Sequence, residues 1–416
     1  MVLCLLSLCQ VGLASTDSVS SATGPRIAIF PLENLSGGPA PLKELDQELS
    51  RVVRQYGILL TEPGSVEGFI ESNQIRYLGG IDERTAALLS EKTGADAVLI
   101  STLELYSDVS PPKFSLICRL VSLKGLPEII WMDSVGIAGD DQPGFLGLGL
   151  INDLKILRAK GLVAIAGSLK GFITSPPPRR RLLSSGRKEE EPFSILNLIR
   201  GIKKEKPLLN QQLGLMRTGD QAEKPYTVED LLQKMKAQGG LFLSRYSPRD
   251  WYSSQDMLVN QEKTIAIIPF FNRSTRKHAA ELQVLHLAKQ LVLDGSFRVL
   301  ELGVIRDKML SMHVIMTDGI SIPSMDLITI SLGVDLLLNG LIFDYLDTVG
   351  YGSYPKIDFS MQMYERESKK ILWSSHSHNQ GDDGVFFFDY GRIATTGALA
   401  DKMCRALVLK LVENAR

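Results

Sequence analysis

The chain has 416 residues, of which 44% are hydrophobic and 22% are charged. That length favours two or three domains, and the composition is typical of a globular protein. The formal net charge of −1 excludes a global field that would attract a polyanion, so we expect no nucleic-acid partner.

The N-terminus has the pattern of an export signal. Residues 1–14 are an uncharged apolar run that ends on Gly12-Leu13-Ala14, with small residues where a signal peptidase cleaves. The run is too short to span a bilayer, which takes about 20 residues. We therefore predict a signal peptide over residues 1–14 and a mature protein in the periplasm or at the periplasmic face of the outer membrane. A lipid anchor on Cys9 stays possible but is disfavoured, because the large Leu8 precedes it.

The elements that follow alternate between strand and helix patterns. A continuous apolar run, typical of a strand covered on both faces, precedes an amphipathic helix. The first predicted elements are a strand at Arg26–Leu32, a helix at Leu42–Tyr56, a short strand at Ile58–Thr61 and helices at Val66–Ser72 and Glu83–Thr93. Gly94 stands where a helix end requires positive φ.

An antiparallel meander and a closing helix complete this unit. The turn residues between three apolar runs indicate hairpin connections. The predicted strands are Ala95–Tyr106, Lys113–Leu123 and Glu128–Ala138, and the predicted helix is Ile151–Leu169. Cys118 and its later counterpart Cys404 are too few for a disulfide framework, so we expect two buried free thiols.

The whole pattern then recurs. Ile27 to Ser36 align with Ile265 to Ser274 at an offset of 238, which is 265 − 27. Gly94-Ala95-Asp96 aligns with Gly333-Val334-Asp335, and Trp131 with Trp373, at offsets of 239 and 242. A nearly constant offset over more than a hundred residues indicates a duplication. We call residues 26–173 the first copy and residues 263–416 the second copy.

A segment of different composition separates the copies. Residues 174–262 begin with a proline run and continue with Arg179 to Arg181 and a Lys/Glu block. Such segments bury too little apolar surface to offset chain entropy, so we predict a largely disordered linker with one short helix near residues 228–237. The expected fold class is therefore α/β: two tandem copies of a layered domain with a mixed sheet, in the order β-α-β-α-α-β-β-β-α.

These motifs resemble a known superfamily. The IAIxPxxN first strand, the G(A/V)DxxL strand, the strand ending on Trp and the Gly-Asp-Asp turn, present in both copies, are similar to CsgG-like and TolB-N-terminal-like envelope domains, the group of the curli-export component CsgG, FlgO and LpoB. The resemblance implies an envelope location, no catalysis and no cofactor, with envelope protein partners or self-association. The long amphipathic hairpins of the pore-forming members are missing from the linker.

Two pairs of residues are candidate binding sites. Asn34 and Ser36, with their counterparts Asn272 and Ser274, follow the first strand of each copy, where α/β sheets commonly bind ligands; an Asx turn that satisfies loop amides is the competing interpretation.

His376 and His378 share one strand face, because the strand period is two. With Asp382 and Asp383 near them, they form a weak metal candidate, against a solvated face as the competing interpretation. The first copy has Ser134 and Gly136 at these positions. The paired carboxylates Asp140 and Asp141, and Asp382 and Asp383, indicate turn and capping chemistry rather than acid–base catalysis.

Three functions remain open. The leading hypothesis is a non-catalytic envelope protein acting in assembly, scaffolding or partner binding. The second is a periplasmic small-ligand or glycan binding protein that uses the loops after the first strands. The third is an enzyme, for which the sequence offers no nucleophile elbow, phosphate loop or zinc spacing.

Overall fold

The computed structural model describes eight stretches of the chain: residues 24–62, 64–141, 150–177, 245–254, 263–314, 319–347, 354–385 and 391–414. The predicted leader, Cys9 and the predicted helix at 228–237 lie outside these stretches. Within them, no helix is both long enough and apolar enough to cross a membrane.

The first copy is built on a mixed sheet. Its strands are β1 (Ile27–Ile29), β2 (Glu33–Asn34), β3 (Ala97–Ser107), β4 (Lys113–Ser122) and β5 (Glu128–Ala138). The order is β1-β3-β4-β5, with β2 also on β3. Strands β1 and β2 run parallel to β3, whereas β3, β4 and β5 form an antiparallel meander. We call this the N-terminal sheet.

Its helices form where the apolar spacing predicts them. They are α1 (Leu42–Gln55), α2 (Ser65–Ser72), α3 (Glu83–Thr93) and α4 (Leu154–Thr174). Helix α1 buries Leu45, Leu49 and Val53, which are spaced as one face of a helix requires. The Asp82 side chain accepts the Thr85 N–H at the start of α3, and Gly94 ends that helix at φ 66°, so the predicted glycine cap is confirmed.

The second copy repeats this connectivity. Its elements are β7 (Lys263–Ile267), β8 (Phe271–Asn272), α7 (Ala279–Asp294), β9 (Phe297–Val299), α8 (Leu302–Ser311), α9 (Ile322–Leu332), β10 (Leu336–Leu346), β11 (Lys356–Glu365), β12 (Lys370–Gln380) and α10 (Thr396–Asn414). The order in this C-terminal sheet is β12-β11-β10-β7-β9. The α/β class with mixed sheets is thus confirmed.

Register irregularities show how closely the two meanders correspond. A bulge falls between Leu103 and Leu105 on β3 and between Ile342 and Asp344 on β10. A second interrupts the β4–β5 pairing at Leu120 and the β11–β12 pairing at Met363. A bulge shifts every later residue to the other face, so shared bulges fix which residues of the two sheets are equivalent.

Two sequence expectations differ from the structure. The short strand expected at Ile58–Thr61 is reduced to one bridge between Leu60 and Ile27, while its counterpart β9 is a full strand. Residues Asp250–Ser253, which lie within the predicted linker, form an additional strand, β6, antiparallel to β12. The stacking of Trp251 on Trp373, with ring centroids 5.5 Å apart, accounts for this extension of the sheet.

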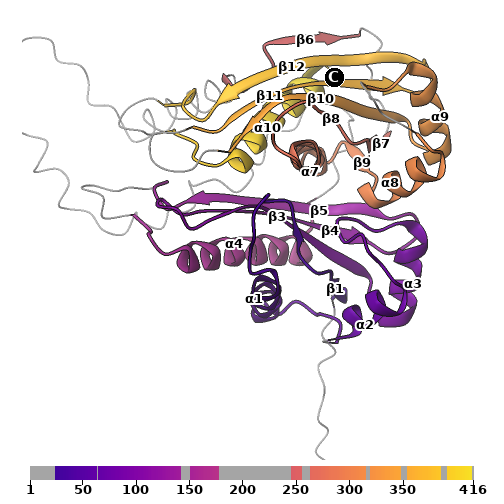
Figure 1. Ribbon diagram of the computed structural model, residues 1–416. Coiled ribbons are helices and arrows are strands. Elements are labelled where there is room, and N and C mark those ends of the chain that lie inside the picture. Colours follow the sequence, from indigo (N-terminus) through magenta and orange to yellow (C-terminus); the bar gives the residue numbers. More distant parts are fainter. Residues whose placement is uncertain are drawn as a thin grey trace, which may run out of the picture.

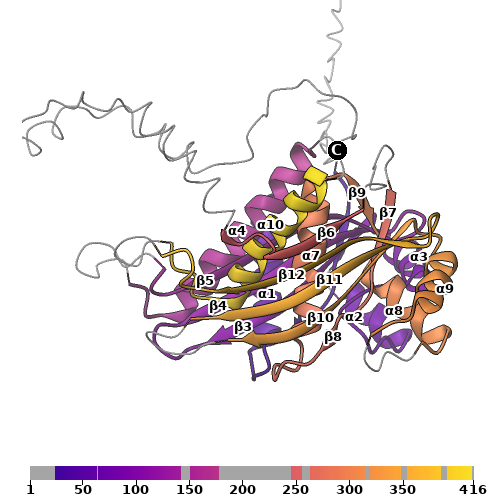
Figure 2. The ribbon, with the colours of Figure 1, turned by 90° about the horizontal axis from the view of Figure 1, so that it is seen from above.

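The two copies lie on one another as alternating layers (Figure 1). From bottom to top these are helices α1 and α4, the N-terminal sheet, helices α7 and α10, and the C-terminal sheet. Figure 2, seen from above, shows the C-terminal sheet over the N-terminal one, with the long strands of both running in about the same direction. The largest core cluster joins residues of both copies, including Val98, Ile117, Leu285 and Leu399. The copies therefore pack head to tail.

Trp131 and Trp373 are equivalent and both are buried, with 5% and 0% of their surface exposed. Trp131 packs in a core between the N-terminal sheet and α4, and Trp373 packs in the core shared by the two copies. Each tryptophan thus anchors the meander of its copy in a core.

Candidate functional site

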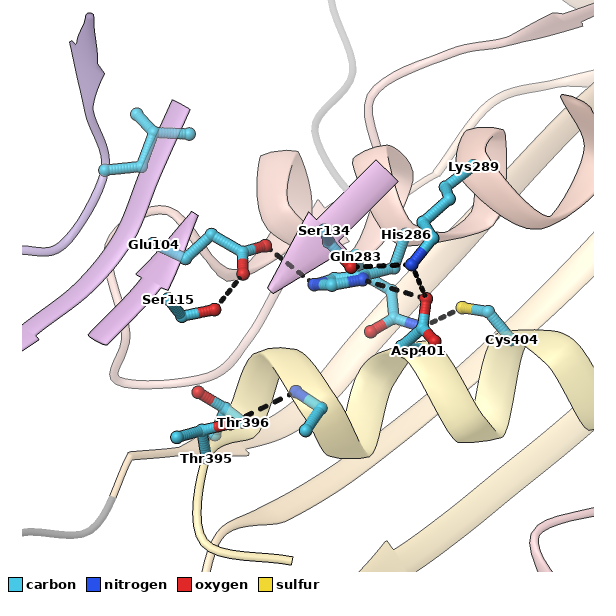
Figure 3. A network of polar contacts seen from close by, with 12 residues as sticks. Glu104, Ser115, Ser134, Gln283, His286, Lys289, Thr395, Thr396, Asp401 and Cys404 are labelled. Atoms are coloured by element: carbon cyan, nitrogen blue, oxygen red, sulfur yellow. Dashed lines mark hydrogen bonds and ion pairs between the residues drawn. The ribbon is translucent and has the colours of Figure 1, made fainter. Parts of the chain in front are cut away.

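A cluster of polar side chains lies between the copies (Figure 3). It joins the outer face of the N-terminal sheet, meaning the face away from α1 and α4, to helices α7 and α10. Its members are Glu104, Ser115, Asp133 and Ser134 from the first copy and Gln283, His286, Lys289, Asp401 and Cys404 from the second. Most of these side chains are buried between the layers, where polar groups are without water and require protein partners.

His286 is at the centre of this cluster. Its Nε2 lies 2.7 Å from Glu104 Oε1, and its Nδ1 lies 3.9 Å from Asp401 Oδ1. Burial alone would lower the pKa of His286, but the Glu104 and Asp401 carboxylates raise it to about 9. The imidazole is therefore a cation at neutral pH, shared between a carboxylate of each copy.

Lys289 extends the cluster by one helical turn. Its Nζ lies 2.8 Å from Asp401 Oδ1 and 3.2 Å from Asp133 Oδ1, and it donates to Ser134 Oγ at 2.8 Å. Burial acts to raise the pKa of Asp401, but Lys289 and His286 together lower it below its usual value. The two cations of α7 thus keep the carboxylate of α10 ionised inside the protein.

A second buried pair holds the opposite end of the junction. Arg119 of β4 donates two hydrogen bonds to Glu301, of 3.2 Å from Nε and 3.1 Å from Nη2. Both side chains are almost fully buried, at 1% and 0% exposure. A bidentate geometry of this kind compensates for part of the cost of burying two charges.

Further arginines tie loops of one copy to the other. Arg276 donates to the backbone oxygens of Leu35 and Glu104, at 3.2 and 2.8 Å. Arg392 pairs with the Asp140 carboxylate. Both guanidinium groups belong to the second copy, and the oxygens that accept these hydrogen bonds belong to the first copy. These contacts therefore fix the relative position of the copies.

Each sequence-predicted Asn–Ser pair forms a closed local turn. Asn34 Oδ1 accepts hydrogen bonds from the backbone N–H and the Oγ of Ser36, at 3.0 and 2.6 Å. Asn272 holds Ser274 in the same way, at 3.0 and 2.7 Å. The amide oxygens are thus already engaged by Asx turns.

The structure brings His376 and His378 together on one carboxylate. Asp358 Oδ1 lies 2.7 Å from His376 Nε2, and Asp358 Oδ2 lies 3.1 Å from His378 Nδ1. Across the part of the chain that the structure describes, no group of three or more His, Cys, Asp or Glu side chains could hold a metal ion. The sequence placed Asp382 and Asp383 beside the histidines, but Asp383 instead accepts the Gln380 N–H at 2.9 Å.

The Gly-Asp-Asp motifs close the meanders. Asp141 Oδ2 accepts the Ala138 N–H at 2.7 Å, as Asp383 accepts that of Gln380. The glycines are required for packing, because a Cβ on Gly139 would meet the backbone oxygen of Ile151. This is turn chemistry, as the sequence indicates.

Cys118 and Cys404 are free and buried, as expected. Burial raises the pKa of the Cys118 thiol to about 12, so the thiolate needed for nucleophilic chemistry is not formed at neutral pH.

A cleft of about 400 Å³ opens beside α1 in the first copy. Its lining combines charged groups of both signs over an apolar floor: Ile29, Asp46, Gln47, Ser50, Arg51, Arg54, Leu60, Thr61, Glu62, Gly64, Val66 and Glu67. Burial raises the pKa of Asp46 to about 6, although the carboxylate accepts the Leu32 N–H.

Sequence reasoning missed the cluster between the copies. Glu104 and His286 are 182 residues apart, so no local pattern joins them. One signal was present: Gln283, His286, Lys289 and Gln290 recur at helical spacing on α7, whose other residues are mostly apolar. A second polar stripe on a helix that already has an apolar face indicates a buried polar contact on its other side.

No protein-family model matches the chain, and no curated protein matches it. Several solved structures resemble part of it. A PelC dodecamer from Paraburkholderia phytofirmans is 11% identical, covers 40% of this chain and 96% of that chain, and gives a TM-score of 0.28. The lipoprotein GNA1162 from Neisseria meningitidis is 16% identical, with 36% and 99% coverage and a TM-score of 0.27. LpoB from Escherichia coli is 13% identical, with 50% and 91% coverage and a TM-score of 0.23. Likeness at this level gives no argument about what the chain does.

Proposed function

We propose that this chain is a non-catalytic bacterial envelope protein that acts in assembly, scaffolding or partner binding, in the periplasm or at the outer membrane. The apolar leader supports export, and the resemblance of the motifs to CsgG-like and TolB-N-terminal-like domains supports an envelope role. The use of the buried ionisable groups supports a structural protein: His286, Lys289 and Arg119 all pair with carboxylates between the copies. Catalytic groups would instead meet in a cleft.

The head-to-tail packing is the observation on which this proposal depends. It leaves two unlike surfaces at the ends of the stack. One is the helical face of α1 and α4, where Ile156 and Val163 are 52% and 46% exposed. The other is the outer face of the C-terminal sheet, where Phe343 is 42% exposed. A protein with two different open faces is suited to hold two different neighbours.

Photocrosslinking in living cells tests this role. A photoreactive amino acid replaces Gln47, on the helical face, or Gln362, on the sheet face, since both side chains are exposed. Glu83 on α3, also exposed, is the matched control. We expect one adduct of reproducible mass from Gln47 or Gln362, in the envelope fraction, and none from Glu83. A chain that stays in the cytoplasm, or that gives no adduct from either face, would contradict the proposal.

The cleft beside α1 favours a second candidate, a small-ligand or glycan binding protein. Arg51, Glu62 and Glu67 offer hydrogen bonds of both kinds beside the apolar Leu60, as polar ligands require. Purified protein is titrated with soluble peptidoglycan fragments, and the melting temperature is followed. A rise that Arg51→Ala abolishes would support a ligand site, and an unchanged melting temperature with every fragment would exclude this candidate.

A further inference from the structure

The contact that joins the two copies is of a kind that can repeat. Helices α7 and α10 of the second copy cover the outer face of the N-terminal sheet. The C-terminal sheet has an equivalent outer face, and α1 with α4 form an equivalent helical face. Head-to-tail contacts between like units produce rings or open filaments unless something stops them. Whether a further copy can stack on the C-terminal sheet therefore depends on the residues of these two faces.

The existing contact needs small residues at its centre. A Cβ added to Gly136 of β5 would lie 2.6 Å from Thr395 Oγ1 and 3.0 Å from the Ala398 nitrogen, at the start of α10. A Cβ added to Gly397 would strike Glu104 and Ser115. Real Cβ atoms do not approach other atoms so closely, so α10 reaches the sheet only because both glycines are present.

The second sheet has large residues in the equivalent places. Gly136 pairs with Ser115 across β4 and β5, and His378 pairs with Asp358 across β11 and β12. Ser134, which accepts from Lys289, likewise corresponds to His376. The shared bulges fix these equivalences. Two imidazoles thus occupy the space into which a helix start would have to fit.

Neighbouring side chains hold these imidazoles in position. Asp358 contacts both rings, at 2.7 Å from His376 Nε2 and 3.1 Å from His378 Nδ1. Phe343 packs edge-on against His376, with ring centroids 5.7 Å apart. The His376 ring is held by both neighbours and the His378 ring by Asp358, so neither ring can swing aside without giving up a contact.

The complementary groups have also changed. Arg119, which pairs with Glu301 between the copies, corresponds to Gln362 on the C-terminal sheet. On the helical side, Gly397 corresponds to Lys155 and Asp401 to Ala159, at the offset of 242 that relates α4 to α10. On the free faces, a helix start therefore cannot come as close to the sheet as at the existing junction. The counterparts of two charged residues of that junction, Arg119 and Asp401, are also uncharged there.

We infer that the His376–Asp358–His378 cluster blocks a further copy of this domain from stacking on the C-terminal sheet, so that the chain is a capped unit of two copies. The histidine pair therefore prevents self-assembly through the head-to-tail contact that joins the two copies within one chain. Among the partners allowed under the proposed function, the inference excludes a further copy of this chain stacked on the C-terminal sheet, and it depends only on the faces described here.

Sedimentation of the purified full chain tests the inference. We expect the mass of one chain, 45.9 kDa, from about 1 to 200 μM protein, where heterologous contacts of moderate affinity would be populated. Lys155→Gly with Ala159→Asp, on the helical face alone, should leave a single chain. The opened variant adds His376→Ser, His378→Gly and Gln362→Arg on the sheet, so that both free faces carry the residues of the existing junction. We expect it to form dimers or larger species with increasing concentration. The control, Ser360→Ala with Ser374→Ala, changes the same face without creating space and should stay a single chain.

Crosslinking identifies the contact. Glu62 corresponds to Glu301, because Leu60 and Val299 bridge Ile27 and Ile265 in the same register. Glu62→Cys and Gln362→Cys are introduced into the unchanged chain and into the opened variant, where cysteine takes the place of arginine at position 362, and both proteins are treated with a short bis-maleimide. We expect crosslinks between chains only in the opened variant. Crosslinks between otherwise unchanged chains would overturn the inference, as would an opened variant that is folded by circular dichroism and still sediments as one chain.

Discussion

The Glu104 carboxylate of β3 and the His286 imidazole of α7 lie 2.7 Å apart, inside the junction of the two copies. Glu104 is 2% exposed and His286 is 0% exposed, so each charge depends on the other for its stability in the interior. The pair makes the docking of the copies sensitive to the protonation of one side chain.

The stability of the protein should therefore fall at alkaline pH. The pKa of His286 is raised from its unfolded value of 6.5 to about 9 in the folded protein. The contribution is fully present below pH 6.5 and is lost as the pH rises through 9, because the folded state must then give up a proton that it binds tightly. The expected loss is about 3 kcal/mol. Urea unfolding at intervals from pH 6 to pH 10 measures it.

The variant His286→Gln is the control for this effect. It should be less stable at pH 6.5 and should show a flatter pH profile between 7 and 9.5, since the titrating group is gone. If the variant keeps the profile of the unchanged protein, another group causes the alkaline loss.

Removing one partner of the buried Arg119–Glu301 pair should destabilise the protein more than removing both partners. Arg119→Met leaves the Glu301 carboxylate buried without its guanidinium, and we expect a loss of about 3–5 kcal/mol. The double variant Arg119→Met, Glu301→Leu removes both charges and should recover much of that loss. A double-mutant cycle from urea unfolding gives the coupling. Additive effects would show that the two side chains do not stabilise each other.

The helical glycines Gly68 of α2 and Gly303 of α8 should respond oppositely to alanine. Gly303 lies against the first copy, and a Cβ there would meet the backbone nitrogen and oxygen of Ile81. Gly303→Ala should therefore destabilise by about 1–3 kcal/mol. Gly68 has nothing within 4 Å of its Cβ position, so Gly68→Ala should stabilise its helix by about 0.5–1 kcal/mol. Thermal unfolding of both variants checks the signs.

The sequence predicted the fold well because its signals are local and occur twice. Gly94 and Gly333 both end helices in the left-handed region, and the meander strands lie within two residues of their expected limits. Strand β6 was missed because Asp250–Ser253 have no counterpart in the first copy, and the aromatic pair Trp251-Tyr252 within an otherwise polar segment was the available signal.

The junction between the copies could not be predicted in the same way. Glu104 corresponds to Phe343, and His286 lies on a helix that reads as apolar. A duplication indicates that two units share a topology, but a head-to-tail contact uses different faces of each, so the contacting residues are not equivalent to one another. The charge pairs across the layers are therefore visible only in the three-dimensional structure.

The three tryptophans should differ in what they contribute. Trp131 and Trp373 are buried in the cores, so replacing either with Ala should cost about 3–5 kcal/mol. Trp251 is 43% exposed and stacks on Trp373, so Trp251→Ala should cost about 0.5–1.5 kcal/mol. Chemical unfolding followed by far-UV circular dichroism avoids the loss of the fluorescent probe. Equal costs at positions 251 and 373 would mean that β6 is an integral part of the core.

Limited proteolysis should cut the chain in two without separating the halves. Trypsin should cleave between residues 178 and 244, where Arg179 to Arg181 and Lys203 to Lys206 provide sites and composition disfavours a packed core. The core that joins the copies includes Val98 and Ile117 from one side and Leu285 and Leu399 from the other, and it does not depend on that segment. We therefore expect two bands on a denaturing gel but a single peak in native size exclusion at pH 7. Two peaks at pH 7 would show that the head-to-tail contact requires the connection, and an uncut chain would show that the segment is protected.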